Sequence, residues 1–441
     1  MPGPDGYVVL GLYAGAGVTV NLTGRGVFEN KTCHFPTRVT YYFLIDLKSA
    51  CTMIPFDFLP DFPNLPRFIH GEGCIKELHE VVSSLGVQRV LLVTDPGLVK
   101  TGHVGYVAKI LNDAGVSVTV FDAVVENPTT LEVDHCVAAA RIGKINAIIG
   151  LGGGSALDTA KGCNFILSNG GIMKDYWGMG KASKPMLPFI AIPTTAGTGS
   201  ESQSFALIAD AESHVKMACG DSKAMPTVAI LDPLLTLTQT AHVTACTGVD
   251  ALAHALESAV TLKRNPDSWP YSVASFRLCI NNLGVVIADP ENIQARYAMQ
   301  LAAAYAGLAI ERSMLGAAHA AANPLTTHYG IVHGQAIAAV LPAVIRYNSR
   351  LAPIAQLYAQ LAIEAKLVRE DMPTDSAVDV LVATVCGLLQ CTGLDTGLGR
   401  LGVPQTWLAS LADEAGRQWT AGFNPRPITA ADFESIYQQA L

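Results

Sequence analysis

The most constraining feature of this sequence is an alternation of short apolar runs with longer helix-like segments between residues 75 and 231. Strands that are buried on both faces become continuous runs of β-branched and leucine residues, because neither face meets water. Such runs separated by helical segments are typical of a parallel sheet that is covered on both sides. Strands are expected at 88–95, 116–121, 145–150, 188–193 and 228–231, with helices at 75–85, 104–114, 131–142 and 156–167.

The strand signal stops after Asp232-Pro233. From residue 235 onward the chain reads as successive Ala- and Leu-rich helices that are separated by Gly, Pro and Asn. A change from alternating elements to helices alone indicates a second part of the fold. We therefore expect a Rossmann-like α/β domain over 53–234 and an all-α domain over 235–441.

Residues 1–52 do not fit this pattern. They are rich in Gly and Tyr and carry no clear period, whereas Met53 opens a plausible start of a folded chain. Two interpretations remain open for this N-terminal extension. Either Met53 is the true initiator and the extension is not native, or the extension is a genuine but disordered arm.

Composition excludes several classes of protein. Only 15% of the 441 residues are charged, and the net charge is −8, so the clustered Lys and Arg of a nucleic-acid-binding protein are missing. No run of about 18 apolar residues appears, so no membrane-spanning helix is expected. The ten cysteines are scattered without a CxxC pair, and no basic segment precedes the apolar N-terminal stretch. These features predict a cytoplasmic protein with reduced cysteines.

The segment INAIIGLGGGSALDTAKG (145–162) joins a predicted strand to a predicted helix through Gly152, Gly153, Gly154 and Ser155. Glycines allow the backbone to approach a ligand closely, and a helix N-terminus attracts a diphosphate. The sequence does not match G-x-G-x-x-G, so a tight strand-to-helix turn with no ligand is the alternative interpretation. We call residues 152–155 the nucleotide turn.

A second polar loop follows the predicted strand at 188–193 and includes Thr194, Thr195 and Thr198. Open parallel sheets bind ligands at the carboxyl ends of their strands, which is where this loop is expected. Asp95 ends another predicted strand, and an acidic residue there accepts hydrogen bonds from a ribose and favours NAD over NADP. The alternative role of Asp95 is to cap the helix that follows it.

The segment TGVDALAHALESAV (247–260) places Asp250 and His254 four residues apart, on one face of a helix. His319 and His333 follow fourteen residues apart. One carboxylate and three imidazoles suit Fe(II) or Zn(II) and leave room for a substrate oxygen. For any single His, a place in the core or on the surface is the alternative interpretation.

These motifs resemble those of the iron-containing (group III) alcohol dehydrogenases. The resemblance rests on GGGSALDTAKG, IPTTAGTGSE, the GVDALAHALES helix, the two later histidines and the terminal GFNPRPIT segment, and it covers residues 56–441. It implies a nucleotide-binding α/β domain joined to an all-α domain, as in the related dehydroquinate synthase architecture, with the active site in the cleft between them.

The resemblance also implies roles for individual residues. It assigns the metal to Asp250, His254, His319 and His333, and it assigns NAD(H) to Asp95, Asn127, Gly152, Gly153, Gly154, Ser155, Thr194, Thr195 and Thr198.

Two departures from the family pattern affect the expected chemistry. Asn323 stands where many members have a His that is thought to move a proton, and an amide has no accessible pKa for this task. His328 is a candidate substitute. Phe205 occupies a position that is polar in some relatives, and we expect it to line the substrate pocket together with Ile310.

The predicted function is therefore hydride transfer between NAD(H) and a small alcohol or aldehyde, with Fe(II) or Zn(II) polarising the carbonyl oxygen. The resemblance also implies a homodimer or larger assembly of identical chains. Two alternatives are a metal- and NAD-dependent lyase of the dehydroquinate synthase type and an NAD-binding protein that no longer catalyses a reaction.

Overall fold

The computed structural model describes residues 7–12, 41–46 and 65–441. The chain divides into two units, Met1–Met53 and Ile54–Leu441. In the first unit, β1 (Tyr7–Leu12) pairs with β2 (Tyr41–Asp46) in antiparallel register. The predictions for the rest of residues 1–52, and for the domain start at residue 53, lie outside the described residues.

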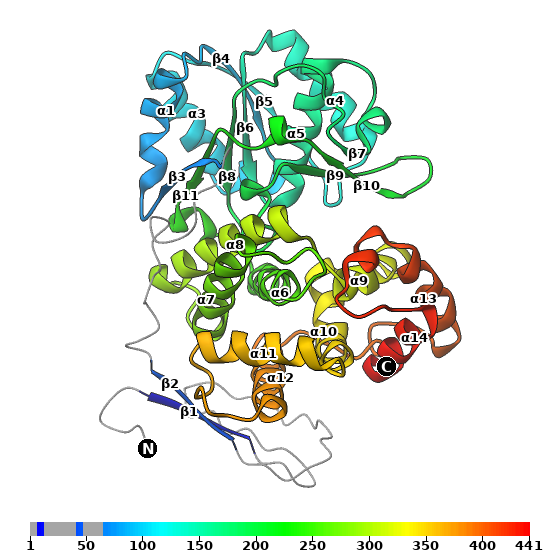
Figure 1. Cartoon of the computed structure of the whole chain (residues 1–441). Helices are drawn as coiled ribbons and strands as arrows, with labels where there is room; N and C mark the ends of the chain where they lie inside the picture. Colours follow the sequence, from blue (N-terminus) through cyan, green and yellow to red (C-terminus); the bar gives the residue numbers. More distant parts are fainter. Residues whose placement is uncertain (1–6, 13–40, 47–64) are drawn as a thin grey trace. The chain divides into compact units, whose positions relative to one another are not determined.

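The second unit contains a six-stranded parallel sheet with the order β3-β11-β8-β6-β4-β5 (Figure 1). Every residue of β6 and β8 at its centre is buried, which explains their continuous apolar sequence. All strands except β3 match predicted ones. The strands are β3 (Arg67–His70), β4 (Arg89–Val93), β5 (Ser117–Phe121), β6 (Ala147–Gly152), β8 (Phe189–Pro193) and β11 (Val228–Leu231).

Helices cover both faces of this sheet. Alternate residues of β4 belong to different apolar cores: Leu91 packs in the core that contains α4 and α5, and Val90 in the core that contains α1 and α3. The sheet therefore forms the middle layer of three, as the sequence predicted. The helices are α1 (Leu78–Ser84), α2 (Pro96–Lys100), α3 (His103–Asp113), α4 (Thr130–Gly143) and α5 (Gly154–Asn169).

A second, three-stranded sheet was not predicted from the sequence. It has the order β7-β10-β9 and contains β7 (Gly178–Met179), β9 (Phe205–Ala209) and β10 (Lys216–Gly220). Strands β9 and β10 are antiparallel, whereas β7 and β10 are parallel. This sheet brings Phe205 and Lys216 into the same layer.

After β11 the described chain is helical, which confirms the predicted all-α region (Figure 1). Helix α6 packs against α7, α8 and α10, and its residues from Gly248 to Ser258 are buried. The helices are α6 (Ala241–Ser258), α7 (Ser268–Ala288), α8 (Ile293–Ser313), α9 (Ala317–Tyr329), α10 (His333–Ser349), α11 (Ala352–Glu364), α12 (Thr374–Cys391), α13 (Leu408–Arg417) and α14 (Ala430–Ala440).

Short 3₁₀ helices connect many of these elements, and two of them lie near the site. They are η2 (Cys74–Glu77), η3 (Met173–Tyr176), η4 (Ser200–Ser202), η5 (Ser222–Ala224), η6 (Pro233–Thr236), η7 (Gln405–Trp407) and η8 (Trp419–Phe423). Of these, η4 follows the second polar loop and η8 packs beside α9.

Two described helices, α7 and α12, are long and apolar enough to cross a membrane by length and composition alone. Of their most apolar windows, 61% and 50% are buried inside the structure. Both helices contribute residues to the same apolar core as α6 and α8. Buried core helices of water-soluble proteins meet the same length and composition criteria. This feature is weak evidence for a membrane span.

Candidate active site

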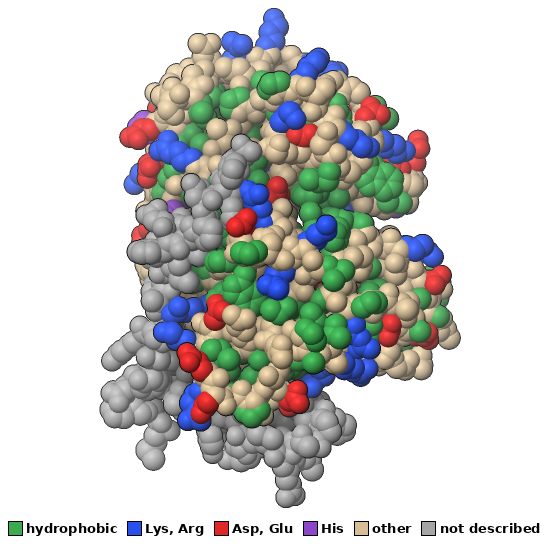
Figure 2. Space-filling model, in the orientation of Figure 1, with side chains coloured by type: hydrophobic (Ala, Val, Ile, Leu, Met, Phe, Trp, Pro, Cys, Tyr) green, Lys and Arg blue, Asp and Glu red, His purple; other side chains and the backbone are tan. Residues whose placement is uncertain are grey.

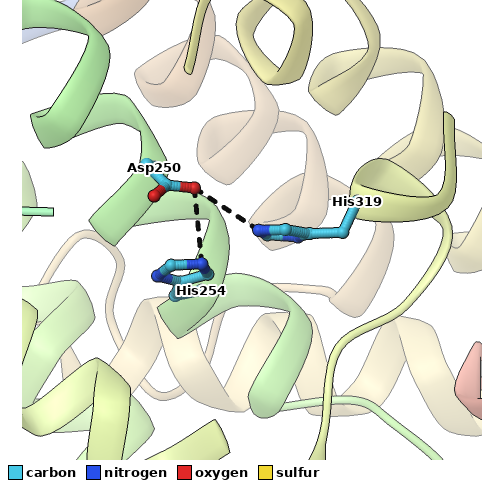
Figure 3. A group of neighbouring side chains, drawn as sticks. All are labelled: Asp250, His254 and His319. Atoms are coloured by element: carbon cyan, nitrogen blue, oxygen red, sulfur yellow. Dashed lines mark ion pairs between the residues drawn. The ribbon is translucent and has the colours of Figure 1, made fainter. Parts of the chain in front are cut away.

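Four predicted metal ligands come together in the helical region. Asp250 and His254 lie one turn apart on α6, while His319 lies near the start of α9 and His333 is the first residue of α10. Their imidazole Nε2 atoms lie 3.3 Å (His254), 3.4 Å (His319) and 3.8 Å (His333) from Asp250 Oδ1. Figure 3 shows the first three residues of this ligand cluster. Residues from three helices thus converge on a single oxygen.

A close helix contact places His333. A Cβ atom on the next residue, Gly334, would lie 2.0 Å from the carbonyl oxygen of Cys246. Only glycine therefore lets the N-terminus of α10 meet α6 one turn before Asp250.

The other ring nitrogens have their own partners. His254 Nδ1 lies 3.2 Å from the carbonyl oxygen of Gly197, and His319 Nδ1 lies 2.5 Å from Glu257 Oε2. Both partners are acceptors, so each Nδ1 carries a hydrogen, and in the neutral form of each ring Nε2 presents a lone pair. Those lone pairs face Asp250.

The ligand cluster fits a divalent cation. Asp250 Oδ1 and His319 Nε2 are buried and have no hydrogen-bond partner within the described part of the chain. When His319 is neutral, its Nε2 and Asp250 Oδ1 are two acceptors 3.4 Å apart, and a cation between them removes their repulsion. One carboxylate with imidazoles is a donor set for Fe(II) or Zn(II).

Burial keeps two of the imidazoles neutral, which is the form that binds a metal. It lowers the pKa of His254 to about 4 and that of His333 to about 3. Burial also opposes a charge on His319, but the carboxylates of Glu257 and Asp250 outweigh it and raise the pKa of His319 to about 9.

The two predicted nucleotide loops also meet. A Cβ on Gly153 would lie 3.3 Å from Thr195 Cγ2, and a Cβ on Gly154 would lie 2.7 Å from Thr198 Cγ2. The backbone N–H of Thr194 donates to the carbonyl of Gly152 over 3.0 Å. The nucleotide turn, including Ser155 in the first turn of α5, thus faces residues 194–198 at the carboxyl edge of the sheet.

Asp95 has the geometry of a helix cap, which was the alternative interpretation of this residue. Its Oδ1 accepts hydrogen bonds from the backbone N–H groups of Gly97 (2.8 Å) and Leu98 (3.1 Å), so it caps α2. Its Oδ2 nevertheless lies 3.7 Å from where a Cβ on Gly152 would be. The carboxylate that caps α2 is therefore held beside the nucleotide turn.

Lys216 is a site residue that the sequence analysis missed. Its Nζ donates to Asn127 Oδ1 over 3.4 Å. Burial lowers the pKa of Lys216, although the nearby carboxylates of Asp158 and Asp250 partly oppose this shift. The positive charge of the lysine in turn lowers the pKa of His333. Lys216 therefore acts electrostatically on the ligand cluster while it touches a predicted cofactor residue. Its signal in the sequence is a single lysine at the start of an unpredicted strand.

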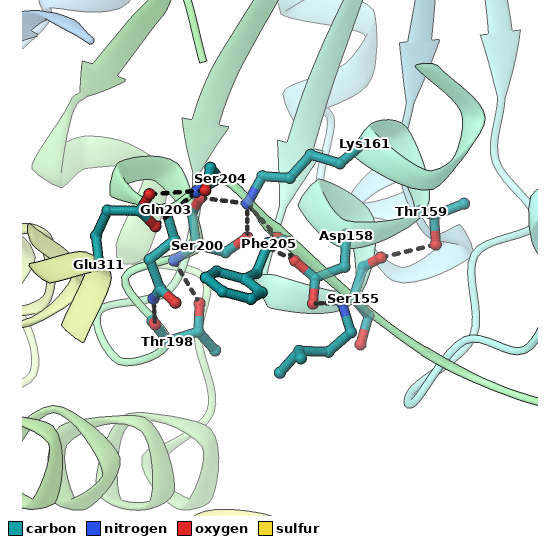
Figure 4. A network of polar contacts seen from close by, with 11 residues as sticks. Ser155, Asp158, Thr159, Lys161, Thr198, Ser200, Gln203, Ser204, Phe205 and Glu311 are labelled. Atoms are coloured by element: carbon teal, nitrogen blue, oxygen red, sulfur yellow. Dashed lines mark hydrogen bonds and ion pairs between the residues drawn. The ribbon is translucent and has the colours of Figure 1, made fainter. Parts of the chain in front are cut away.

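A buried hydrogen-bond network around Lys161 holds the second polar loop, which we call the threonine-rich loop (194–200), against α5 (Figure 4). This network was not predicted from the sequence. Lys161 Nζ donates to the carbonyl (2.6 Å) and the hydroxyl (2.8 Å) of Ser200 and to the carbonyl of Phe205 (2.8 Å). Ser200 Oγ donates to Asp158 Oδ1 over 2.6 Å. These bonds fix the loop that faces the nucleotide turn.

The predicted pocket residues Phe205 and Ile310 are both buried. The ring of Phe205 stacks on Trp419 of η8, with 6.2 Å between centroids, so the aromatic pair bridges the α/β and helical regions. Figure 2 shows a hollow between these regions with hydrophobic side chains along its edge. Glu311, which follows Ile310, accepts hydrogen bonds from the backbone N–H (3.0 Å) and Oγ (2.7 Å) of Ser204.

The two proposed proton-relay residues lie in different surroundings. Asn323 is one turn after His319 on α9, and its Nδ2 donates to Gln418 Oε1 over 3.1 Å. His328 lies at the far end of α9, where its Nε2 is 2.6 Å from Glu414 Oε2. The ion pair gives His328 a role in joining α9 to α13, and the structure does not bring it to the ligand cluster.

Comparison with known proteins agrees with this geometry. At 32% identity, the chain is similar to an NAD-dependent methanol dehydrogenase of Bacillus methanolicus, over 85% of this chain and 98% of that protein. It is 34% identical to a 1,3-propanediol dehydrogenase of Klebsiella pneumoniae, over 88% of this chain and 99% of that one.

Solved structures show the same fold. A 1,3-propanediol oxidoreductase matches with a TM-score of 0.83 and 33% identity, over 86% of this chain and 98% of that one. An alcohol dehydrogenase from Oenococcus oeni matches with a TM-score of 0.82 and 30% identity, over 86% and 99% of the two chains.

The family "Iron-containing alcohol dehydrogenase" matches residues 66–233, and "Fe-containing alcohol dehydrogenase family, C-terminal" matches residues 244–441. These matches confirm the predicted two-part fold, the predicted NAD-dependent alcohol oxidoreductase and its NAD(H) and iron cofactors. This chain belongs to the iron-containing alcohol dehydrogenase family.

Proposed function

We propose that this chain interconverts a small primary alcohol and its aldehyde at the ligand cluster, with NAD(H) bound across the nucleotide turn. The observation that carries the proposal is a pair of buried atoms without a hydrogen-bond partner in the described residues, Asp250 Oδ1 and His319 Nε2, which lie 3.4 Å apart. His254 links this pair to the nucleotide side, because its ring bonds to Gly197 in the threonine-rich loop.

When bound, the metal ion supplies a Lewis acid that polarises the substrate oxygen, and the nicotinamide supplies or accepts the hydride. The protein supplies position and electrostatic field. The first turn of α5 presents backbone N–H groups beside Gly153 and Gly154, which suits a diphosphate. Lys216 contacts Asn127 and interacts electrostatically with Asp250 and His333.

Proton transfer must use a route other than a histidine at position 323. Asn323 holds its amide against Gln418 and has no pKa for a relay, and His328 is held by Glu414. We infer that Asn323 orients the substrate and that the proton leaves through water or a nucleotide hydroxyl.

The proposed substrate is small and partly apolar. Phe205, Trp419 and Ile310 supply apolar surface, and relatives are named for methanol and 1,3-propanediol. We further propose a cytoplasmic homodimer, which the scattered cysteines and the family resemblance support. Light scattering on the purified protein tests the dimer.

A His254→Ala variant tests the proposed function. We expect metal content to fall from about one ion per chain to almost none, and NADH oxidation with short aldehydes to be lost, because a cluster ligand is missing. The control is His79→Ala on α1, which changes an exposed histidine. Full turnover by metal-free His254→Ala would overturn the proposal.

The wild-type protein separates the alternatives in the same assay. Bound metal and bound NADH without oxidation of any aldehyde would favour an NAD-binding protein that does not catalyse. Conversion of a phosphorylated acid with no net change in NADH would favour the lyase.

A further inference from the structure

We propose that Glu257 positions His319 as a metal ligand and provides a second negative charge that strengthens metal binding. The inference rests on the metal-dependent function proposed above. Glu257 lies on α6 beyond His254, one turn further along the same face as Asp250 and His254, and only 4% of it is exposed.

Both oxygens of Glu257 are used by adjacent residues of α9. Oε2 lies 2.5 Å from His319 Nδ1, and Oε1 accepts a hydrogen bond from the backbone N–H of Ala318 over 2.6 Å. The residue before the helix, Gly316, provides no side-chain cap. Glu257 therefore caps α9 from a neighbouring helix and holds the ligand in the same contact.

The start of α9 is fitted closely to this carboxylate. A Cβ on Gly316 would lie 3.1 Å from Glu257 Oε1 and 3.2 Å from Asn424 Oδ1. Asn424 Oδ1 also accepts from the backbone N–H of Ala317 over 3.3 Å. Two side-chain oxygens thus hold the first turn of α9, which fixes the direction in which His319 leaves it.

This geometry determines which nitrogen of His319 binds the metal. An ionised carboxylate only accepts, so Nδ1 carries the hydrogen and Nε2 offers its lone pair toward Asp250. Asp250 and Glu257 together carry two negative charges, which match the charge of a divalent cation. Carboxylate partners of ligating histidines raise metal affinity by about 10- to 100-fold in other proteins.

The test is the affinity of the whole chain for Zn²⁺ and Co²⁺, measured by competition with a chelator, in wild type and in Glu257→Gln. The amide keeps the size of the side chain but removes its charge, so we expect about 10- to 100-fold weaker binding. The matched control is Glu311→Gln, which changes another carboxylate that accepts from a backbone N–H and a side chain. Its metal affinity should stay within about twofold of wild type.

Two further measurements keep the inference testable if Glu257→Gln folds poorly. Glu257→Asp keeps the charge, and we expect it to bind metal more tightly than Glu257→Gln. In zinc-loaded wild type, ¹⁵N spectra of the His319 ring should show hydrogen on Nδ1 and metal at Nε2.

Unchanged affinity in folded Glu257→Gln, or metal at Nδ1 of His319, would overturn the inference while leaving the proposed function intact. Failure of wild type to bind either metal would instead overturn the proposed function.

Discussion

At the residue scale, the nucleotide turn depends on the absence of side chains. Gly154 lies against Thr198 so closely that an added Cβ would be 2.7 Å from its Cγ2, and Thr198 has a short, stiff side chain that cannot move far. Gly153 has more room, because its nearest neighbour would lie at 3.3 Å. The requirement for glycine is therefore strongest at the first residue of α5.

Gly154→Ala should weaken NADH binding by about tenfold, because the two loops must separate and misplace the N–H groups of α5. Fluorescence titration with NADH measures this change. Metal content should be unaffected. Gly105→Ala on α3 is the control, since nothing lies within 4 Å of the added Cβ. Equal NADH affinity in Gly154→Ala and wild type would show that the diphosphate of NADH does not bind at this turn.

Glu201 should make the stability of the protein depend on pH. Burial raises its pKa from 4.5 to about 7, although Lys161 opposes the shift. Because the folded state holds this proton more tightly, its contribution to stability is complete below about pH 4.5 and is lost as the pH rises through about 7. Each unit of pKa corresponds to about 1.4 kcal/mol.

When the pH is raised from about 5 to about 8, the free energy of unfolding of wild type should therefore fall relative to that of Glu201→Gln. We expect this relative change to exceed about 1.4 kcal/mol. Urea unfolding of the metal-free proteins at both pH values measures the difference. The exposed Glu434→Gln serves as the control and should show no such trend. A difference between Glu201→Gln and wild type that stays constant with pH would contradict the assignment.

At the element scale, the connection from α8 to α9 contains an unusual backbone. Met314 has φ 90° and ψ 178°, a backbone conformation that residues other than glycine rarely adopt. The next element is α9, which carries His319 and is held at its start by Glu257 and Asn424. The strain thus lies directly before the helix that presents His319, a predicted metal ligand.

Met314→Gly should be more stable than Met314→Ala by about 1 kcal/mol, because both lose the methionine side chain but only glycine relieves the strain. Chemical unfolding of the metal-free variants compares them directly. If Met314→Ala proved as stable as Met314→Gly, the backbone at this position would not be strained.

At the scale of the whole molecule, the site depends on the α/β region and the helical region keeping a fixed relation. Ser204, just before β9, donates both its backbone N–H and its hydroxyl to Glu311 at the end of α8. The same segment contains Phe205, which stacks on Trp419. One short segment of the α/β region therefore contacts the helical region through both polar and apolar groups.

A double-mutant cycle with Ser204→Ala and Glu311→Gln should give a coupling energy of about 1 kcal/mol or more, as expected for a buried hydrogen bond to a carboxylate. Urea unfolding of the four proteins measures it. Additive effects of the two substitutions would show that this contact does not contribute to joining the regions.

The amino-acid sequence by itself determined the parallel sheet, the change to helices after Asp232, and the residue types of the ligand cluster. These features are local: a strand buried on both faces must be continuously apolar, and Asp250 and His254 share a helix face because of their spacing. The two later histidines were also candidates from the sequence, and the family resemblance assigned them to the same metal. Strand β3 and the sheet β7-β10-β9 were missed, because short strands carry little periodic signal.

Only the tertiary structure decided which distant residues meet. It placed Glu257 on His319, Lys216 beside Asn127 and Lys161 on Ser200, and it moved His328 away from the ligand cluster to Glu414. Such contacts join residues on different elements, so no local pattern encodes them. They follow from how helices pack at close range, as where Gly334 meets Cys246, and burial then sets the charges of the side chains that pack there.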